Sequence, residues 1–147
     1  MSSTVDANTL VYASNQADPS HEPARQLMER LAIGPEIVYL FWPVIMGYLR
    51  LVTNPRILPR PMAPADAVRN VDQLLAGSHV RAPGELDGFW DLYRATAGAQ
   101  VRGPAVPDAH LVALMRQHDV HILYTRDRGF RRYPGIKVLD PIAAQAT

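Results

Sequence analysis

Short runs of β-forming residues alternate with longer helical patterns along almost the whole of this sequence. The β-type runs are the start of STVDANTLVYASN, followed by EIVYL, HVRAP, VHILYT and IKVL. The helical patterns are the rest of STVDANTLVYASN, then SHEPARQLMERLAIG, WPVIMGYLRLVTNP, ADAVRNVDQLLAG, ELDGFWDLYRATAGAQ and VPDAHLVALMRQHD. Apolar strands that alternate with helices are typical of a parallel sheet covered on both faces. The sequence therefore predicts an α/β fold.

Several boundaries of these helices are marked by residues that favour them. Ser20 is expected to cap the helix that Gly34 ends. Pro43 suits the first turn of its helix, and Pro55 follows the end of the same pattern. The proline-rich stretch RILPRPMAP is expected to form a surface loop. The next helix is expected to place four apolar residues on one face, namely Val68, Val71, Leu74 and Leu75.

Length and composition are those of a globular protein. The 147 residues suit one domain, residues 1–147, and 48% are hydrophobic while 20% are charged. No apolar run approaches the roughly 18 residues of a membrane helix, and MSSTVDANTL lacks the layout of a signal peptide. The chain has no cysteine, which excludes disulfides and thiolate metal sites. We therefore expect a cytoplasmic protein with no membrane partner.

Three acids stand where a ligand site of an α/β fold is expected. Asp6 ends the first strand, Asp127 follows VHILYT, and Asp108 begins the helix that leads into that strand. Ligands of such folds bind beyond the carboxyl ends of the strands. Taken alone, each acid is better explained as a helix cap or a turn residue. Together in one crevice they would repel one another unless a cation neutralised them, and Mg²⁺ prefers such oxygen ligands.

Arginine is strongly preferred over lysine in this chain. There are fourteen arginines and one lysine, and the net charge is only +1. A GC-rich genome explains such an excess as well as function does. Guanidinium groups match phosphate oxygens, however, and four arginines cluster around Asp127. These are Arg126, Arg128, Arg131 and Arg132.

Four stretches together resemble a known family: VDANTLVYA, WPVIMGYLRLVTNPRIL, VPDAHLVALMRQHDV and ILYTRDRGFRRYPGIKVLDP. The chain is similar, nearly end to end, to the PIN-domain ribonucleases, and specifically to the VapC toxins of type II toxin–antitoxin systems. The resemblance implies a PIN-like three-layer α/β/α sandwich with a central, mostly parallel sheet. It also implies an endoribonuclease, dependent on Mg²⁺ or Mn²⁺, that cleaves cellular RNA to arrest growth. A VapB-type antitoxin and a homodimer are the implied partners.

The resemblance also implies roles for residues of this chain. Asp6, Asp108 and Asp127 would be the catalytic residues and the metal ligands. Asn8 and Thr125 would line the same site and contact the substrate. The arginine cluster would hold the RNA backbone. His110, one turn inside its helix, is expected to be structural and not catalytic.

The chain departs from the family pattern at two positions. Many PIN domains carry a glutamate where this chain has Tyr48, with Gly47 as the neighbouring possibility, and no acid occurs in residues 41–62. A second frequent acid is replaced by Gly129. The site thus offers three carboxylates instead of four or five. Acids from elsewhere in the chain that could compensate are Glu85 and Asp87.

Other functions remain open at this level. A PIN fold with a reduced acid set could bind RNA or an antitoxin without cleaving it. A phosphatase of the haloacid-dehalogenase type is disfavoured, because it needs a second aspartate where this chain has Asn8. Receiver-type signalling is disfavoured because no adjacent acids precede Asp6. The aromatic residues of two helices are interpreted as core or interface residues more readily than as base-stacking platforms; these are Trp42, Trp90 and Tyr93.

Overall fold

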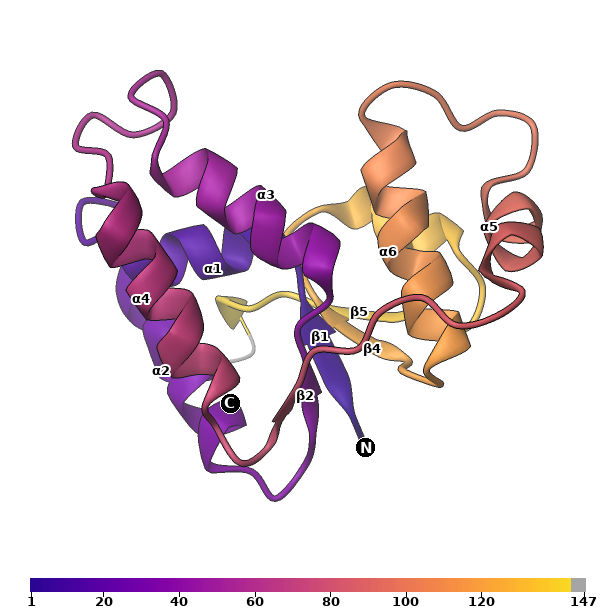
Figure 1. The fold of residues 1–147 in the computed structure, drawn as a ribbon, viewed down its shortest axis with the longest axis horizontal. Helices are drawn as coiled ribbons and strands as arrows, with labels where there is room; N and C mark the ends of the chain where they lie inside the picture. The colour runs from indigo at the N-terminus through magenta and orange to yellow at the C-terminus, as the bar shows by residue number, and fades with distance from the viewer. Residues whose placement is uncertain (144–147) are drawn as a thin grey trace.

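The computed structural model describes residues 1–143 and contains one parallel sheet. Its strand order is β3-β2-β1-β4-β5, and every neighbouring pair is parallel (Figure 1). The strands are short: β1 (Ser3–Val5), β2 (Val38–Tyr39), β3 (Val80–Arg81), β4 (Ile122–Tyr124) and β5 (Lys137–Leu139). The predicted α/β class and parallel sheet are confirmed.

Six α-helices and one 3₁₀ helix connect the strands. They are α1 (Ala7–Ser14), α2 (His21–Ile33), α3 (Trp42–Val52), α4 (Pro64–Leu75), α5 (Phe89–Ala97), α6 (Ala105–Gln117) and the 3₁₀ helix η1 (Arg128–Arg132). The chain moves outward from β1 to β3 and then crosses back to β4, so right-handed connections put the two sets of helices on opposite faces. Figure 1 shows α1, α2 and α4 on one side of the strands and α5 and α6 on the other. This is the three-layer sandwich that the sequence predicts.

The register of the sheet brings the ends of β1 and β4 together. Val5 pairs with Tyr124, so Asp6 and Thr125 follow neighbouring strands at the same edge. The backbone N–H of Asp6 donates to the carbonyl of Tyr124 at 3.3 Å. The carboxyl edge of the sheet thus fixes Asp6 beside the segment that leads to Asp127.

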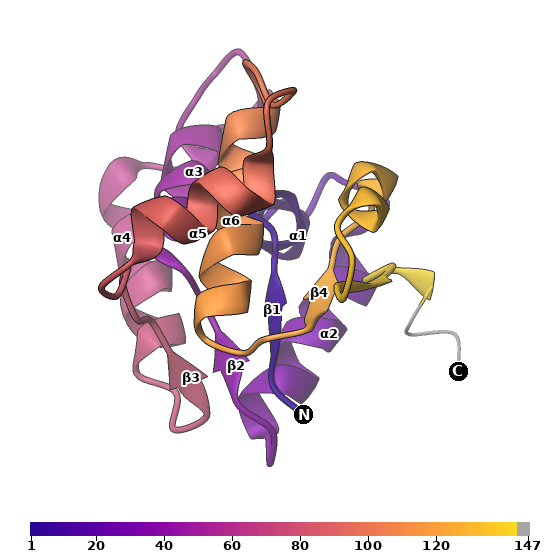
Figure 2. The same ribbon diagram turned by 90° about the vertical axis from the view of Figure 1, so that its right-hand side faces the viewer.

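Helix α6 owes its position to the number of apolar side chains that it buries. Residues 109 and 111–115 are all buried, so this helix is packed on nearly its whole circumference. Each fully buried aliphatic side chain of this kind stabilises the fold by about 1.5–3 kcal/mol. Figure 2 shows α6 crossing the face of the sheet, with α5 lying over it. The deep burial of α6 fixes where its first turn, with Asp108, meets the edge of the sheet.

Some details differ from the sequence predictions. Helix α4 turns Ala67 and Val71 to the core and leaves Val68 50% exposed, so the predicted apolar face is wrong at Val68. Helix α5 begins at Phe89 and not at Glu85. The residues before it form a loop that the side chain of Gln117 holds through the backbone N–H and carbonyl groups of residues 86 and 87.

Two other expectations concern helix starts and loops. Ser20 does precede the first residue of α2, but its side chain makes no capping hydrogen bond. Its own backbone N–H donates to the carboxylate of Asp18 at 2.7 Å. The stretch between α3 and α4 is a loop as predicted, although Leu58 within it is buried. Across residues 1–143, no helix has the length and apolar character needed to cross a lipid bilayer.

Candidate functional site

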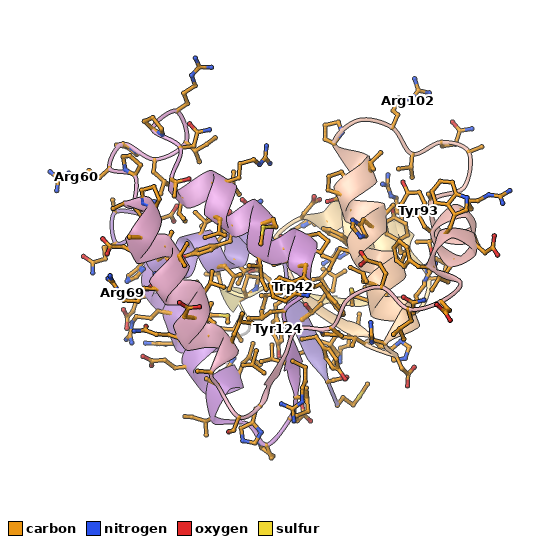
Figure 3. The ribbon with its side chains drawn as sticks, in the orientation of Figure 1. Trp42, Arg60, Arg69, Tyr93, Arg102 and Tyr124 are labelled. Atoms are coloured by element: carbon orange, nitrogen blue, oxygen red, sulfur yellow. The ribbon has the colours of Figure 1, made fainter. Side chains whose placement is uncertain are left out.

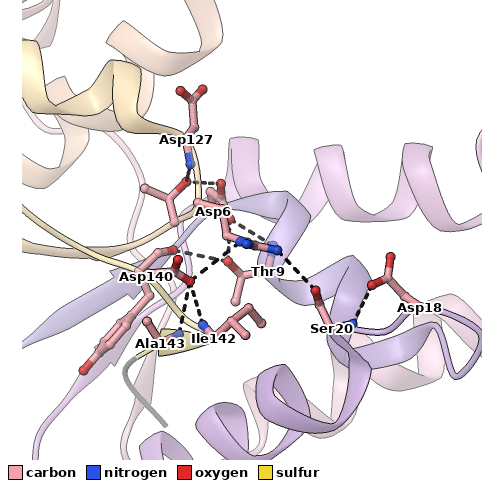
Figure 4. A network of polar contacts seen from close by, with 11 residues as sticks. Asp6, Thr9, Asp18, Ser20, Asp127, Asp140, Ile142 and Ala143 are labelled. Atoms are coloured by element: carbon pink, nitrogen blue, oxygen red, sulfur yellow. Dashed lines mark hydrogen bonds and ion pairs between the residues drawn. The ribbon is translucent and has the colours of Figure 1, made fainter. Parts of the chain in front are cut away.

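Asp6 is the fixed point of the site at the carboxyl edge of the sheet. Its Oδ1 accepts hydrogen bonds from the backbone N–H of Thr9 at 2.9 Å and from the Thr9 hydroxyl at 2.7 Å. Its Oδ2 accepts a hydrogen bond from the Thr125 hydroxyl at 2.5 Å (Figure 4). Both threonines are buried, and Asp6 is only 9% exposed. The capping bond at the start of α1 and the bond from Thr125, which follows β4, therefore hold this carboxylate in one orientation.

Burial raises the pKa of Asp6 above its ordinary value. The hydrogen bonds from Thr125 and Thr9 lower the pKa, but they do not offset the loss of solvation. The negative charge of Asp127 raises it further. The ionised form of Asp6 is thus disfavoured in the protein alone, and a neighbouring cation would stabilise it.

Asp127 is joined to Asp6 through Thr125. The Thr125 hydroxyl donates to Asp6 and accepts from the backbone N–H of Asp127 at 3.0 Å. The Oδ1 atom of Asp127 accepts from the backbone N–H of Gly129 at 2.8 Å and so caps η1. Asp127 is exposed, and Figure 4 shows its carboxylate directed away from Asp6. One threonine hydroxyl therefore sets the relative position of two predicted ligands.

Asp108 enters the site from the first turn of α6. It is half-buried, and burial is the main cause that raises its pKa above the ordinary value. The charges of Asp127 and Asp6 raise this pKa as well, while Arg132 lowers it. The three predicted acids, which come from three separate segments, therefore interact electrostatically at one edge of the sheet.

These acids do not form a ready-made metal cluster. Among residues 1–143, no three His, Asp or Glu side chains lie close enough together to hold an ion as they stand. The donor set nevertheless fits a divalent cation. Of the three acids, only Asp6 has both carboxylate oxygens in hydrogen bonds, so Asp108 and Asp127 each keep an oxygen that could bind an ion. No hydrogen bond contributes to the pKa of Asp108. An ion that keeps several waters needs few protein carboxylates.

The predicted substrate-contact residues are not all directed to the acids. Asn8 is exposed on the first turn of α1. Arg126 turns away toward Ser20, at 3.4 Å, and Asp140, at 3.8 Å (Figure 4). Arg132 lies over the ring of Tyr133, 5.0 Å from its centroid, and is the arginine that lowers the pKa of Asp108. The remaining two arginines of the cluster, Arg128 and Arg131, are exposed.

The two positions considered for the missing glutamate, Tyr48 and Gly47, have different surroundings. Tyr48 is buried, and its hydroxyl lies 2.7 Å from the hydroxyl of Ser14 on the side of α3 that faces α4. A Cβ atom at Gly47 would lie 3.2 Å from the Cβ of Ala7, which follows Asp6. Of the two positions, Gly47 is thus the one beside the residue that follows Asp6, and it carries no side chain.

Of the two acids proposed as replacements, Glu85 is engaged by a histidine. Glu85 accepts a hydrogen bond from Nε2 of His110 at 2.7 Å, and this bond is the main cause that lowers the pKa of Glu85. The His110 ring packs against Phe89, with centroids 5.4 Å apart. His110 thus connects α6 with α5, in keeping with the structural role expected for it. Asp87 lies in the same loop before α5 and is exposed.

An apolar hollow, which the sequence did not indicate, lies away from the acids. It has a volume of ≈ 370 Å³ between α1, α2, α4 and the strands β2 and β3. Its walls are mainly apolar and include Leu10, Leu40 and Leu74, while Tyr48 and Asn70 add polar groups. No sequence motif marks it, because its walls come from helices and strands that are far apart in the sequence.

Comparisons with known proteins agree with this architecture. The family model of the PIN domain matches residues 4–136. Ribonuclease VapC48 of Mycobacterium tuberculosis is 49% identical over 144 residues, which cover 97% of this chain and 99% of the relative. Ribonuclease VapC43 of the same organism is 36% identical over 144 residues, with 96% of each chain covered.

Solved structures show the same fold at low sequence identity. VapC20 of M. tuberculosis, described as a toxin that cleaves the sarcin–ricin loop, matches with a TM-score of 0.66 at 19% identity, over 92% of this chain and 98% of that one. FitAcB from Neisseria gonorrhoeae matches with a TM-score of 0.64, also at 19% identity, over 95% and 97% of the two chains. The sequence matches show more than the fold: this chain belongs to the VapC ribonucleases of the PIN-domain family.

Proposed function

We propose that this protein is a Mg²⁺-dependent endoribonuclease and acts as the toxin of a type II toxin–antitoxin pair by cleaving cellular RNA. The observation that carries the proposal is the buried, hydrogen-bonded Asp6 carboxylate, whose pKa is raised by burial and by the charge of Asp127. A protein gains no stability from such an arrangement unless a cation or a proton joins it. Mn²⁺ is the alternative ion, because it accepts the same oxygen ligands.

The ion would be held by Asp6, Asp108 and Asp127. When bound, it supplies an activated water and stabilises negative charge on the phosphate under attack. The chain itself contributes orientation, since the threonines that bond to Asp6 keep its carboxylate in place. Arg132 is the arginine best placed to hold a substrate phosphate, because its charge acts on Asp108.

Asn8, Thr125 and the other arginines have different shares in the proposal. Asn8, exposed on the first turn of α1, would contact the RNA directly. Thr125 is buried and acts through Asp6 and Asp127, so it is a positioning residue. Arg128 and Arg131 are exposed on η1 and would contribute general attraction for the RNA backbone. Arg126 would contribute least, since its guanidinium faces Asp140.

The proposed partners are a VapB-type antitoxin and a second copy of the chain. The apolar hollow beside α4 offers an antitoxin segment a place to bury side chains, at a distance from the acids. A symmetric homodimer follows from family analogy and from the general preference for closed two-fold assemblies. We propose further that residues 1–147 act as one domain and that the toxin works in the cytoplasm, where its RNA target lies.

A protein that binds RNA or an antitoxin without cleaving it is the second candidate. Gly47, which leaves the site without a fourth carboxylate, is the observation in its favour. The two functions differ in one assay: cleavage of total bacterial RNA with Mg²⁺, with EDTA, and by the Asp6→Asn variant. Asn caps a helix as well as Asp does, so this variant should keep its fold.

The expected result is cleavage that requires the divalent ion and that is lost in Asp6→Asn at unchanged circular dichroism. Cleavage that persists in EDTA would refute the metal-dependent nuclease. Salt-sensitive RNA binding with no cleavage under any condition would favour the binding protein.

A further inference from the structure

Helix α5 presents a stacked aromatic pair in which one ring packs at the edge of the core and the other is largely exposed. The rings of Trp90 and Tyr93 lie 5.8 Å apart with an interplanar angle of 10°, and Trp90 is 66% exposed. Tyr93 is half-buried between α5 and α6 (Figure 3), where its ring also contacts Phe89. Trp90 was expected in the core or at an interface, and its exposure excludes the core. One face of the Trp90 indole is held by Tyr93, and the side chain is otherwise largely open to solvent.

Two hollows connect this pair to the edge of the catalytic site. The first, ≈ 610 Å³, is lined by Trp90, Tyr93 and Arg94, and by Asp91, which pairs with Arg94 at 3.7 Å. The second, ≈ 410 Å³, is lined by Arg116 and Arg132. Both hollows share the small residues Ala95 and Ala97 as part of their lining, so they adjoin along the end of α5.

The second hollow is electropositive. Its lining contains two arginines and no carboxylate. Arg116 donates to the hydroxyl of Thr96 at 3.2 Å and to the carbonyl of Pro134 at 2.8 Å, so its guanidinium is oriented without a neutralising acid. Arg132 is oriented by the ring of Tyr133 and lowers the pKa of Asp108. The same arginine thus borders the hollow and acts on the candidate catalytic acids.

We infer that the path from Arg132 through Arg116 to Trp90 binds a single-stranded stretch of RNA next to the cleaved phosphate. A base stacks on the exposed face of Trp90, and the guanidinium groups contact backbone phosphates. Unpaired bases are commonly bound in this way, by aromatic stacking beside a basic groove. The inference rests on the proposed nuclease function and adds to it the form of RNA that the site accepts.

The positive charge argues against a second copy of the chain as the occupant. A two-fold contact centred on the hollow of Arg116 and Arg132 would bring these uncompensated arginines of two copies against each other. RNA supplies phosphates with the opposite charge and bases that can stack on the exposed face of Trp90. RNA is thus the occupant that satisfies both features.

Intrinsic fluorescence gives a direct test, because the chain has two tryptophans. In Trp42→Phe protein the only tryptophan is Trp90, and in Trp90→Phe protein it is Trp42. Both would carry Asp6→Asn to prevent cleavage and would be titrated in Mg²⁺ buffer with a short unstructured oligoribonucleotide and with total bacterial RNA. Binding would be followed separately by anisotropy of a labelled oligoribonucleotide and by gel shift.

The expected result is quenching of Trp90 emission by RNA and little change in Trp42 emission. Trp90→Ala should weaken binding about tenfold, the effect of losing one stacked base, while Trp42→Ala serves as the matched control. RNA binding that leaves Trp90 emission unchanged, with Trp90→Ala binding as tightly as the parent, would overturn the inference and leave the nuclease function intact.

Two further outcomes would also overturn it. If Trp90→Ala halves the molar mass measured by light scattering without changing RNA affinity, the aromatic pair belongs to a dimer contact. If the otherwise unchanged protein neither binds nor cleaves any RNA, the proposed function fails, and the inference fails with it.

Discussion

Replacement of Thr125 by valine should test how the site is positioned. Thr125 is 1% exposed, and its hydroxyl donates to Asp6 at 2.5 Å and accepts from the N–H of Asp127 at 3.0 Å. Valine has nearly the same shape, so no cavity forms and only the hydroxyl is lost. The substitution therefore separates hydrogen bonding from packing, which an alanine substitution would not do.

The magnitude follows from the kind of hydrogen bond that is lost. A bond to a charged group contributes about 1.5–3 kcal/mol to stability. The N–H of Asp127 lies at an exposed residue and can bond to water, so its loss adds little. We expect Thr125→Val to lower the free energy of unfolding by about 2 kcal/mol at a pH where Asp6 is ionised.

The effect should depend on pH in a definite direction. The hydroxyl of Thr125 lowers the pKa of Asp6, so the variant should have a still higher pKa at Asp6 than the parent. A carboxyl group with a raised pKa in the folded state contributes stability below its unfolded pKa, and this contribution is lost as the pH rises through the folded value. The difference between variant and parent should thus shrink as the buffer is made acidic and Asp6 becomes protonated.

Urea unfolding at several pH values, read by circular dichroism, measures this difference. Thr125→Ser is the matched control, because it keeps the hydroxyl and removes the methyl group. RNA cleavage should fall in Thr125→Val and be largely retained in Thr125→Ser. Equal stability and equal cleavage in the two variants would refute a positioning role for the hydroxyl.

Two other variants test the electrostatics of the site. Asp108→Asn should abolish cleavage and leave stability unchanged or raise it by a fraction of a kcal/mol, because burial and the charges of Asp127 and Asp6 raise the pKa of Asp108. Chemical unfolding beside the cleavage assay checks this, and a large loss of stability would contradict it. Gly47→Glu should tighten Mg²⁺ binding in calorimetric titration. It should also destabilise the fold by about 1–3 kcal/mol, since the new Cβ at position 47 would lie 3.2 Å from the Cβ of Ala7. Unchanged Mg²⁺ affinity would show that position 47 does not face the ion.

The parts of the fold that follow from local patterns were predictable from the sequence. The alternation of β-type and helical runs is a property of neighbouring residues, and it predicted the parallel sheet and both helical layers. The rule that ligands bind at the carboxyl ends of parallel strands then predicted the edge at which Asp6 and Asp127 lie. Neither step requires knowledge of which side chains touch.

The errors arise where the direction of one side chain decides the outcome. Successive residues of a helix point about 100° apart, so the sequence, which left Tyr48 and Gly47 both open, could not separate the core position from the one beside Ala7. Arg126 lies two residues after β4, yet it faces Asp140 from the C-terminal segment. Trp90 was expected in the core or at an interface, and α5, which lies on the outside of α6, leaves it exposed.

The buried position of Asp6 shows why the site cannot be explained by stability alone. Burial raises the pKa of Asp6, which means that its charged form has a desolvation cost. A residue without charge at this position would avoid that cost. The chain instead surrounds Asp6 with two threonines, one of which also fixes the backbone of Asp127. A helix cap alone would need only the bond to Thr9, which an exposed aspartate or serine provides equally well. The bond from Thr125 stabilises the carboxylate, but the two further acids nearby only raise its pKa by repulsion, and the proposed cation gives that repulsion a purpose.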